Sequence, residues 1–276
     1  MGTIFPVIVC IAKSEENYIE EFVKYHLALG FSHIYIYDNE DNMTYNKILE
    51  KYLDNVSILH TSGNNYVNGI KYMILEHFKD NILFKDERIT HAITIDIDEF
   101  IVLKKHKNIT EFIEEYIKED CQGIGINRVF FGSSGEEKET NEPITQRFIK
   151  CSEKADKRIK TLYNKTHYKG YGLCYNVLLK EGTIRNTRNE IIYGSNNINN
   201  IDLDIIQINK YKIKSYEEFK RISKRGKSSL NDMYNYYLGT TLDNYIEDEL
   251  NKYDINEKED ITAKEFYKNN VINKIV

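Results

Sequence analysis

The chain has 276 residues, of which 41% are hydrophobic and 12% are aromatic. A chain of this length and composition can form a hydrophobic core, which excludes a largely disordered protein. Its 38 lysines and arginines are outnumbered by 43 aspartates and glutamates, so the formal net charge is −5. This charge disfavours nucleic acid as a partner, and an anionic ligand would need a metal ion or a few well-placed cations.

The cysteines are well separated and form no C-x-x-C pair, so a zinc knuckle is not expected. We predict reduced, mostly buried thiols at Cys10, Cys121, Cys151 and Cys174. The apolar stretch at residues 4–12 is too short to span a bilayer and lacks a secretory cleavage signal. We therefore expect a soluble, cytoplasmic protein without a transmembrane segment, and the sequence does not determine its oligomeric state.

The first half of the chain alternates strand and helix patterns. Apolar runs predict strands at residues 4–12, 33–37, 56–60, 91–97 and 123–131. Apolar positions three and four residues apart predict helices at residues 15–29 (capped by Ser14), 45–52, 67–78 and 109–117. The alternation predicts an α/β fold with a mostly parallel, Rossmann-like central sheet flanked by helices. Ligands of such sheets bind at the carboxyl ends of the strands.

The pattern loosens after Phe131. Shorter strands are predicted at residues 144–149, 158–163, 175–179 and 203–208. Ser215 can cap a helix that runs to Lys224 and ends at Gly226. Since no linker rich in proline or glycine divides the chain, we predict one domain at residues 1–226, with a helical extension packed on it at residues 227–276.

A D-x-D motif is the clearest chemical signal. Asp96 and Asp98 end the predicted strand at residues 91–97, where both carboxylates can face a crevice. Such a pair suits Mg²⁺ or Mn²⁺ beside a phosphate group. The spacing alone fits an acidic strand-to-loop junction without a ligand equally well. A D-x-D phosphatase is a weaker alternative, because Phe100 stands where those enzymes carry Thr or Val, and because the motif follows the fourth strand rather than the first.

Four blocks occur in the order in which one family carries them. They are K-S-E-E-N…H-I-Y-I-Y-D-N at 13–39, I-D-I-D-E-F at 95–100, F-G-S-S-G at 131–135 and K-S-Y-E-E-F…R-G at 214–226. Over roughly residues 7–226 the chain resembles glycosyltransferase family 92 and the related family-2-like transferases. The resemblance implies a GT-A fold, with a nucleotide-sugar-binding half at 1–128 and an acceptor half at 129–226. It also implies an inverting transfer of a sugar from a nucleotide sugar, most often a UDP-sugar, to an acceptor hydroxyl.

The resemblance further implies a donor site. Asp96 and Asp98 match the metal-binding pair of the family, so Mn²⁺ or Mg²⁺ is the expected cofactor. Asp96 would face the ribose or a metal-bound water, and Asp98 would ligate the metal directly. Residues that follow the first two strands would surround the nucleoside: Ala12, Lys13, Glu15, Asp38 and Asn39.

An acceptor hydroxyl that attacks a sugar must lose its proton, so a carboxylate base is expected. The glycine-rich turn at 132–135 is followed by Glu136, Glu137 and Glu139. We predict Glu137 as the base and Glu136 as the second candidate, with Glu139 and Asp156 as further possibilities. A solvated acidic loop without a catalytic role is the alternative interpretation.

One departure from the family pattern bears on the metal. The family usually reads N-H-Y where this chain has Asn209, Lys210 and Tyr211. A protonated lysine cannot ligate a metal but can pair with a phosphate oxygen, so we predict that Lys210 contacts the donor and that metal dependence is weaker. Lys160, in a K-T-L block, is predicted to contact the diphosphate or the acceptor; an ordinary edge-strand cation is the alternative.

The departure at Lys210 leaves a non-catalytic nucleotide-sugar-binding scaffold as an alternative to an enzyme. For an enzyme, the expected partners are a nucleotide-sugar donor and a glycan, lipid-linked or protein acceptor. No nucleic acid partner is expected.

Overall fold

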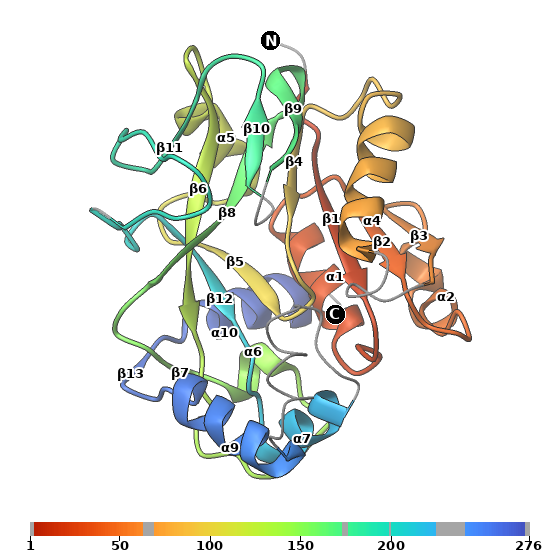
Figure 1. The fold of residues 1–276 in the computed structure, drawn as a ribbon, viewed down its shortest axis with the longest axis vertical. Helices are drawn as coiled ribbons and strands as arrows, with labels where there is room; N and C mark the ends of the chain where they lie inside the picture. The colour runs from red at the N-terminus through yellow and green to blue at the C-terminus, as the bar shows by residue number, and fades with distance from the viewer. Residues whose placement is uncertain (1–2, 63–68, 173–175, 199, 225–240, 274–276) are drawn as a thin grey trace.

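The computed structural model describes residues 3–62, 69–172, 176–198, 200–224 and 241–273. Figure 1 shows a central sheet with helices packed around it, and helices α7 and α9 together at one end of the molecule. The first half of the chain follows the predicted order of strands and helices: β1 (Pro6–Ala12), α1 (Ile19–Ala28), β2 (His33–Asp38), α2 (Tyr45–Ile48), η1 (Glu50–Tyr52), β3 (Val56–His60), α4 (Ile70–Phe78), the π-helix η2 (Lys79–Leu83) and β4 (His91–Thr94).

Helix α1 begins later than predicted, and Ser14 does not cap it. Ser14 has a left-handed φ of 54°, and its amide donates to the carboxylate of Glu40. The amides of Tyr18 and Ile19 instead donate to the carbonyl of Glu15, at 3.0 and 2.9 Å, before the helix proper starts. The residues between β1 and α1 therefore form a turn at the end of the strand rather than a first helical turn.

The second half has more and shorter elements. They are β5 (Glu99–Leu103), α5 (Ile109–Tyr116), β6 (Cys121–Phe130), α6 (Ile144–Arg147), β7 (Lys150–Cys151), β8 (Asp156–Asn164), η3 (Lys165–His167), β9 (Tyr168–Tyr171), β10 (Val177–Leu179), β11 (Thr183–Arg185), β12 (Ile206–Lys210), α7 (Tyr216–Lys224), α9 (Leu242–Tyr253), β13 (Lys258–Glu259), α10 (Thr262–Tyr267) and the π-helix η5 (Lys268–Ile272).

The strand predicted at residues 144–149 is wrong, because the short helix α6 stands there. Its first amides are bound by the buried carboxylate of Glu21, which accepts from the amide of Ile144 at 2.6 Å and from the amide and hydroxyl of Thr145 at 3.0 and 2.6 Å. A carboxylate at this position satisfies amides that have no partner within the helix. The capping group comes from α1, so no local pattern signals it.

The sheet is mixed, because it contains antiparallel as well as parallel strand pairs. Its strand order is β3-β2-β1-β4-β8-β6-β12-β5, with β11 beside β6. The first four strands pair in parallel, as predicted, and so do β6 with β12 and β6 with β11. Strand β8 is antiparallel to both β4 and β6, and β5 is antiparallel to β12.

The D-x-D segment crosses the sheet. Strands β4 and β5 are separated by four residues in sequence but by three strands in the sheet. Strand β4 pairs with β8 only at His91 and Ala92, so the two strands diverge toward residue 95. At the start of the segment, the amide of Ile95 donates to the carbonyl of Val9 on β1. At its end, the carbonyl of Asp98 accepts from the amide of Tyr211, the residue that follows β12. The segment therefore bridges the two halves of the sheet where they separate.

Both faces of the sheet are buried. Successive residues of β1 belong to different hydrophobic clusters, with Ile8 and Cys10 on one face and Val7 and Val9 on the other. Helices α1, α5 and α10 cover the first face, and α4 with the β9–β10 hairpin covers the second. The three cysteines in the described residues are buried and unpaired, as predicted, and Cys174 lies outside those residues.

The C-terminal residues are not purely helical, because β13 pairs with β7. Ala263, Tyr267 and Val271 are part of the main core, so α10 and η5 pack on the sheet. Ser215 caps α7 as predicted: its hydroxyl accepts from the amide of Glu218 at 3.2 Å, and its own amide donates to that side chain at 3.1 Å. The predicted end of α7 at Gly226 lies outside the described residues. Within the described parts of the chain, every helix is too short or too polar to cross a bilayer.

Candidate functional site

The carboxyl ends of β1, β2 and β4 meet at one edge of the sheet. Ala12, the last residue of β1, pairs with Asp38, the last residue of β2, and the amide of Asn39 donates to the carbonyl of Ala12 at 2.9 Å. Burial raises the pKa of the Cys10 thiol, and the nearby carboxylates of Asp96 and Glu15 add to the effect. The structure thus brings the residues predicted around the nucleoside next to the D-x-D segment.

Asp38 is fully buried and only partly satisfied. Its Oδ1 accepts from the amide of Glu40 at 2.8 Å, while Oδ2 has no hydrogen-bond partner in the described part of the chain. Burial raises the pKa of this carboxyl group. Glu15 is also buried, and its amide donates to the hydroxyl of Tyr45 at 3.0 Å, whereas the side chain of Lys13 is exposed.

Three ammonium groups converge on the carboxylate of Asp96. They are Nζ of Lys71 on α4 at 3.1 Å, of Lys160 on β8 at 3.4 Å and of Lys210 at the end of β12 at 3.2 Å. We call these three residues the lysine triad. Nζ of Lys210 also lies 2.6 Å from Oδ1 of Asp98. Asp96, Asp98, Lys160 and Lys210, which we predicted as site residues, therefore form one cluster.

Glu99 closes the cluster from inside the protein. Its fully buried carboxylate lies 3.0 Å from Nζ of Lys160, 3.4 Å from Nζ of Lys210 and 3.3 Å from Nη1 of Arg128. Arg128 also forms an ion pair with Asp156. Since this carboxylate is occupied by a guanidinium group, the contact argues against Asp156 as a free base.

These contacts fix the ionisation of the cluster. Burial by itself would raise the pKa of Asp96 and of Glu99, but the lysines around them outweigh it, so that the pKa of Asp96 falls well below its usual range and that of Glu99 falls to about 2. Burial would lower the pKa of Lys210, yet its carboxylate partners raise it overall. Asp96, Glu99 and Lys210 are therefore charged near neutral pH.

The expected divalent cation does not fit this arrangement. The described residues contain no group of three or more His, Cys, Asp or Glu side chains that could hold a metal ion. An Mg²⁺ ion sits about 2.0–2.1 Å from its carboxylate oxygens, and the ammonium of Lys210 fills the space beside Asp98. Mn²⁺ or Mg²⁺ stays a prediction from the sequence.

The candidate bases lie on the loop that follows β6. The amide of Phe131 donates to the carbonyl of Lys210 at 3.0 Å, so this loop leaves the sheet beside the lysine triad. Glu136 and Glu137 are exposed, and their carbonyls accept from the first amides of α7 at 3.4 and 3.1 Å. Glu139 instead forms an ion pair with Arg221 at 2.7 Å. The structure thus leaves Glu136 and Glu137 exposed on this loop.

Sequence reasoning missed three charged members of the cluster. Glu99 stood inside the I-D-I-D-E-F block but was not singled out. Arg128 lies in an apolar strand, where a buried charge needs a counter-ion, so the sequence pattern alone indicated a buried ion pair at this residue. Lys71 carries no motif at all, and only the packing of α4 against the sheet places it beside Asp96.

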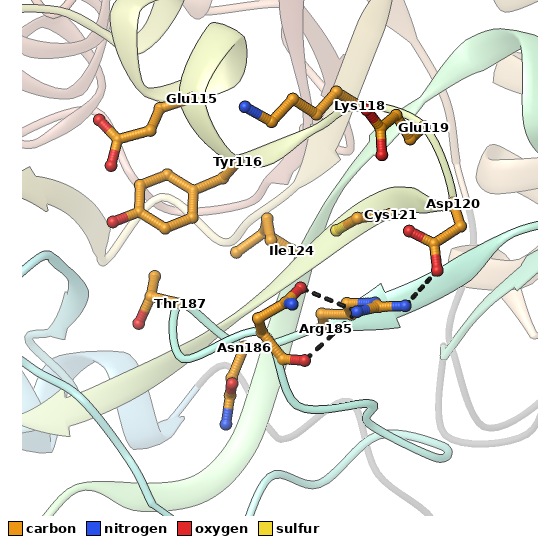
Figure 2. A pocket seen from close by; sticks show the side chains of 11 residues that line it. Glu115, Tyr116, Lys118, Glu119, Asp120, Cys121, Ile124, Arg185, Asn186 and Thr187 are labelled. Carbon is orange, nitrogen blue, oxygen red and sulfur yellow. Dashed lines mark hydrogen bonds and ion pairs between the residues drawn. The ribbon is translucent and has the colours of Figure 1, made fainter.

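A separate pocket of about 310 Å³ lies between the end of α5, the start of β6 and β11. Figure 2 shows Glu115 and Tyr116 on one side of it and Arg185 and Asn186 on the other. Arg185 forms an ion pair with Asp120. None of the predicted site residues lines this pocket.

The sequence model of glycosyltransferase family 92 matches residues 5–231. Together with the acidic pair at the end of β4, this match defines a glycosyltransferase. The chain belongs to glycosyltransferase family 92.

Comparison with solved structures finds distant similarity. The Staphylococcus aureus TarS fragment 1–349 is 13% identical with a TM-score of 0.36, over 59% of this chain and 48% of the fragment. The same fragment in complex with UDP is 14% identical with a TM-score of 0.34, over 50% and 38%. HddC from Yersinia pseudotuberculosis is 11% identical with a TM-score of 0.34, over 59% and 78%. The chain thus spans about half of the TarS fragment or less. Comparison with curated proteins finds no match.

Proposed function

We propose that the protein transfers a sugar from a nucleotide sugar, most simply a UDP-sugar, to the hydroxyl of an acceptor, with inversion at the anomeric carbon. The observation that carries this proposal is the convergence of three lysines and the D-x-D carboxylates at the edge where β1, β2 and β4 end, in a chain of family 92. An edge of this kind is where α/β sheets bind nucleotides.

The nucleoside would bind at the ends of β1 and β2, against Ala12, Lys13, Glu15, Asp38 and Asn39. The unpaired oxygen of Asp38 supports this placement, because buried polar atoms in folded proteins nearly always have a partner. An N–H of a base or a ribose hydroxyl would supply the missing donor. The diphosphate would then extend toward Asp96 and the lysine triad.

The proposed reaction is a single displacement. The acceptor oxygen bonds to the anomeric carbon, and the bond from that carbon to the diphosphate oxygen breaks. The electron pair of the broken bond stays on the diphosphate, where nearby ammonium groups stabilise the charge. The hydroxyl proton passes to a carboxylate, with Glu137 as the first candidate and Glu136 as the second. The products are the glycosylated acceptor, a nucleoside diphosphate and one proton.

The exposed loop that carries Glu136 and Glu137 supports an acceptor larger than a free sugar, such as a glycan, a lipid-linked sugar or a protein. Nucleic acid is not proposed as a partner, given the net charge of −5. A cytoplasmic location remains a prediction from the sequence.

The first test is a thermal-shift panel of UDP, GDP, CDP and dTDP, since a ligand that binds the folded state raises its melting temperature. We expect a shift with UDP that is much smaller in Asp38→Asn, whose buried oxygen is proposed to meet the nucleoside, and that is kept in Asp80→Asn, an exposed aspartate outside the site. Release of UDP from UDP-sugars, with water as the acceptor, is then measured for wild type and Glu137→Gln. No shift with any of the four nucleotides would refute the proposal. Binding without release from any donor would favour the non-catalytic scaffold.

A further inference from the structure

The charges of the D-x-D segment are already balanced. Its carboxylates are those of Asp96, Asp98 and Glu99, and they face the three ammonium groups of the lysine triad, while Asp156 is matched by Arg128. A site for a divalent cation presents an excess of negative charge before the ion arrives. Here a divalent ion would add two positive charges to a set of side chains that is already neutral.

Lys210 fills the position between the two aspartates. Its Nζ is within 3.4 Å of Asp96, Asp98 and Glu99, which matches the three protons of an ammonium group to three carboxylates. The side chain is only 11% exposed. A metal ion could enter only by displacing this ammonium and leaving it buried beside another cation, which is strongly unfavourable.

The lysine triad also marks a point where an anion is stabilised. The carboxylate of Asp96 is the most exposed acid of the cluster, at 38%, and all three ammonium groups approach it. Glu99 holds Lys160 and Lys210 from the buried side, so their positions do not depend on a ligand. Phosphate oxygens that take the place of the Asp96 carboxylate would therefore meet three cations that are already in position.

We propose that the lysine triad takes the place of a divalent cation, so that this site binds the diphosphate of its nucleotide without metal. Lys210 supplies the central charge, and Lys71 and Lys160 flank it. This inference rests on the proposed function for the identity of the ligand, but its own claim concerns the source of the positive charge.

The test is titration calorimetry of the full chain with UDP and with inorganic pyrophosphate, each in EDTA and in 1 mM Mn²⁺. We expect the Kd of each ligand to agree within about threefold between the two conditions. A Kd at least 30-fold weaker in EDTA would overturn the inference while leaving the proposed function intact. Pyrophosphate binding in EDTA without any binding of UDP would support the lysine triad and refute the proposed donor class. If neither ligand binds in either condition, both proposals fail.

Two variants make the role of Lys210 specific. Lys210→Ala should weaken binding in EDTA at least 30-fold. Lys210→His should lose binding in EDTA and regain it with Mn²⁺, because a neutral imidazole joins Asp96 and Asp98 as a metal ligand. Lys104→Ala is the matched control, since this lysine pairs with Asp260 outside the site, and it should bind as wild type does.

Circular dichroism checks that each variant is folded. Binding of Mn²⁺ itself, followed by electron paramagnetic resonance, should be undetectable at 0.1 mM in wild type and appear in Lys210→His. Tight binding of Mn²⁺ by the wild-type protein would contradict the inference even if every variant failed to fold.

Discussion

Replacing Arg147 by methionine tests the ion pair that ties α6 to α7. Two nitrogens of Arg147 lie 3.1 and 2.9 Å from the two oxygens of Glu218, and one of them also donates to the carbonyl of Lys138 at 2.9 Å. The two side chains are 2% and 0% exposed. Methionine keeps most of the packing but leaves the carboxylate of Glu218 buried, with hydroxyl and amide donors alone. Removing one partner of a buried pair costs about 3–5 kcal/mol of the free energy of unfolding.

The assay is equilibrium unfolding in urea at pH 7, followed by circular dichroism. Arg221→Met is the matched control, because Arg221 is 37% exposed and its pair with Glu139 should contribute only about 0–1 kcal/mol. The double variant Arg147→Met/Glu218→Gln should recover most of the loss, since no unpaired charge remains and glutamine still accepts hydrogen bonds from Ser215 and Tyr18. Equal losses in the two single variants, or no recovery in the double variant, would refute the reasoning.

Three further results are expected. Burial raises the pKa of Glu21 from 4.5 to about 7, so the folded state binds this proton more tightly than the unfolded state does. The free energy of unfolding should therefore fall by up to about 3 kcal/mol as pH rises from 4.5 to 7. Glu21→Gln should abolish this fall in urea titrations at several pH values. Gly132→Ala should lower stability by about 1–3 kcal/mol in thermal melts, because a Cβ there would lie 2.6 Å from the carbonyl of Ile255. Gly123→Ala is the control: its nearest contact is at 3.2 Å, so its loss of stability should be smaller. Asp38→Asn should weaken UDP binding at least tenfold in calorimetry without loss of stability; an unchanged Kd would remove Asp38 from the nucleoside pocket.

Much of the first half of the fold could be predicted because its signals are local. The apolar run of β1 and the amphipathic pattern of α1 need no knowledge of distant residues, and both were found, although α1 starts at Ile19 rather than residue 15. The turn at Ser14 was missed because it depends on a contact with Glu40. Local signals thus predicted which elements form better than where they begin.

The antiparallel strand β8 and the helix α6 could not be predicted in the same way. Pairing of β8 between β4 and β6 is set by chain geometry over many residues, and α6 is capped by Glu21, more than 120 residues earlier in the chain. The D-x-D acids could be found because carboxylates at the end of an apolar strand are unusual. Their counter-ion Lys71 could not, because nothing in its neighbourhood distinguishes it from other surface lysines.

The position of β12 has a consequence for the order in which the protein assembles. This strand lies between β6 and β5, and Lys210 comes 112 residues after its partner Asp98. During synthesis the chain therefore presents β5 and β6 with open edges, and the acids of the D-x-D segment without their central cation, until β12 emerges. Pairing over such a separation is slow, because the entropy of closing a long loop is lost before the contacts form. The insertion of β12 thus closes the sheet and completes the charge cluster in the same late step.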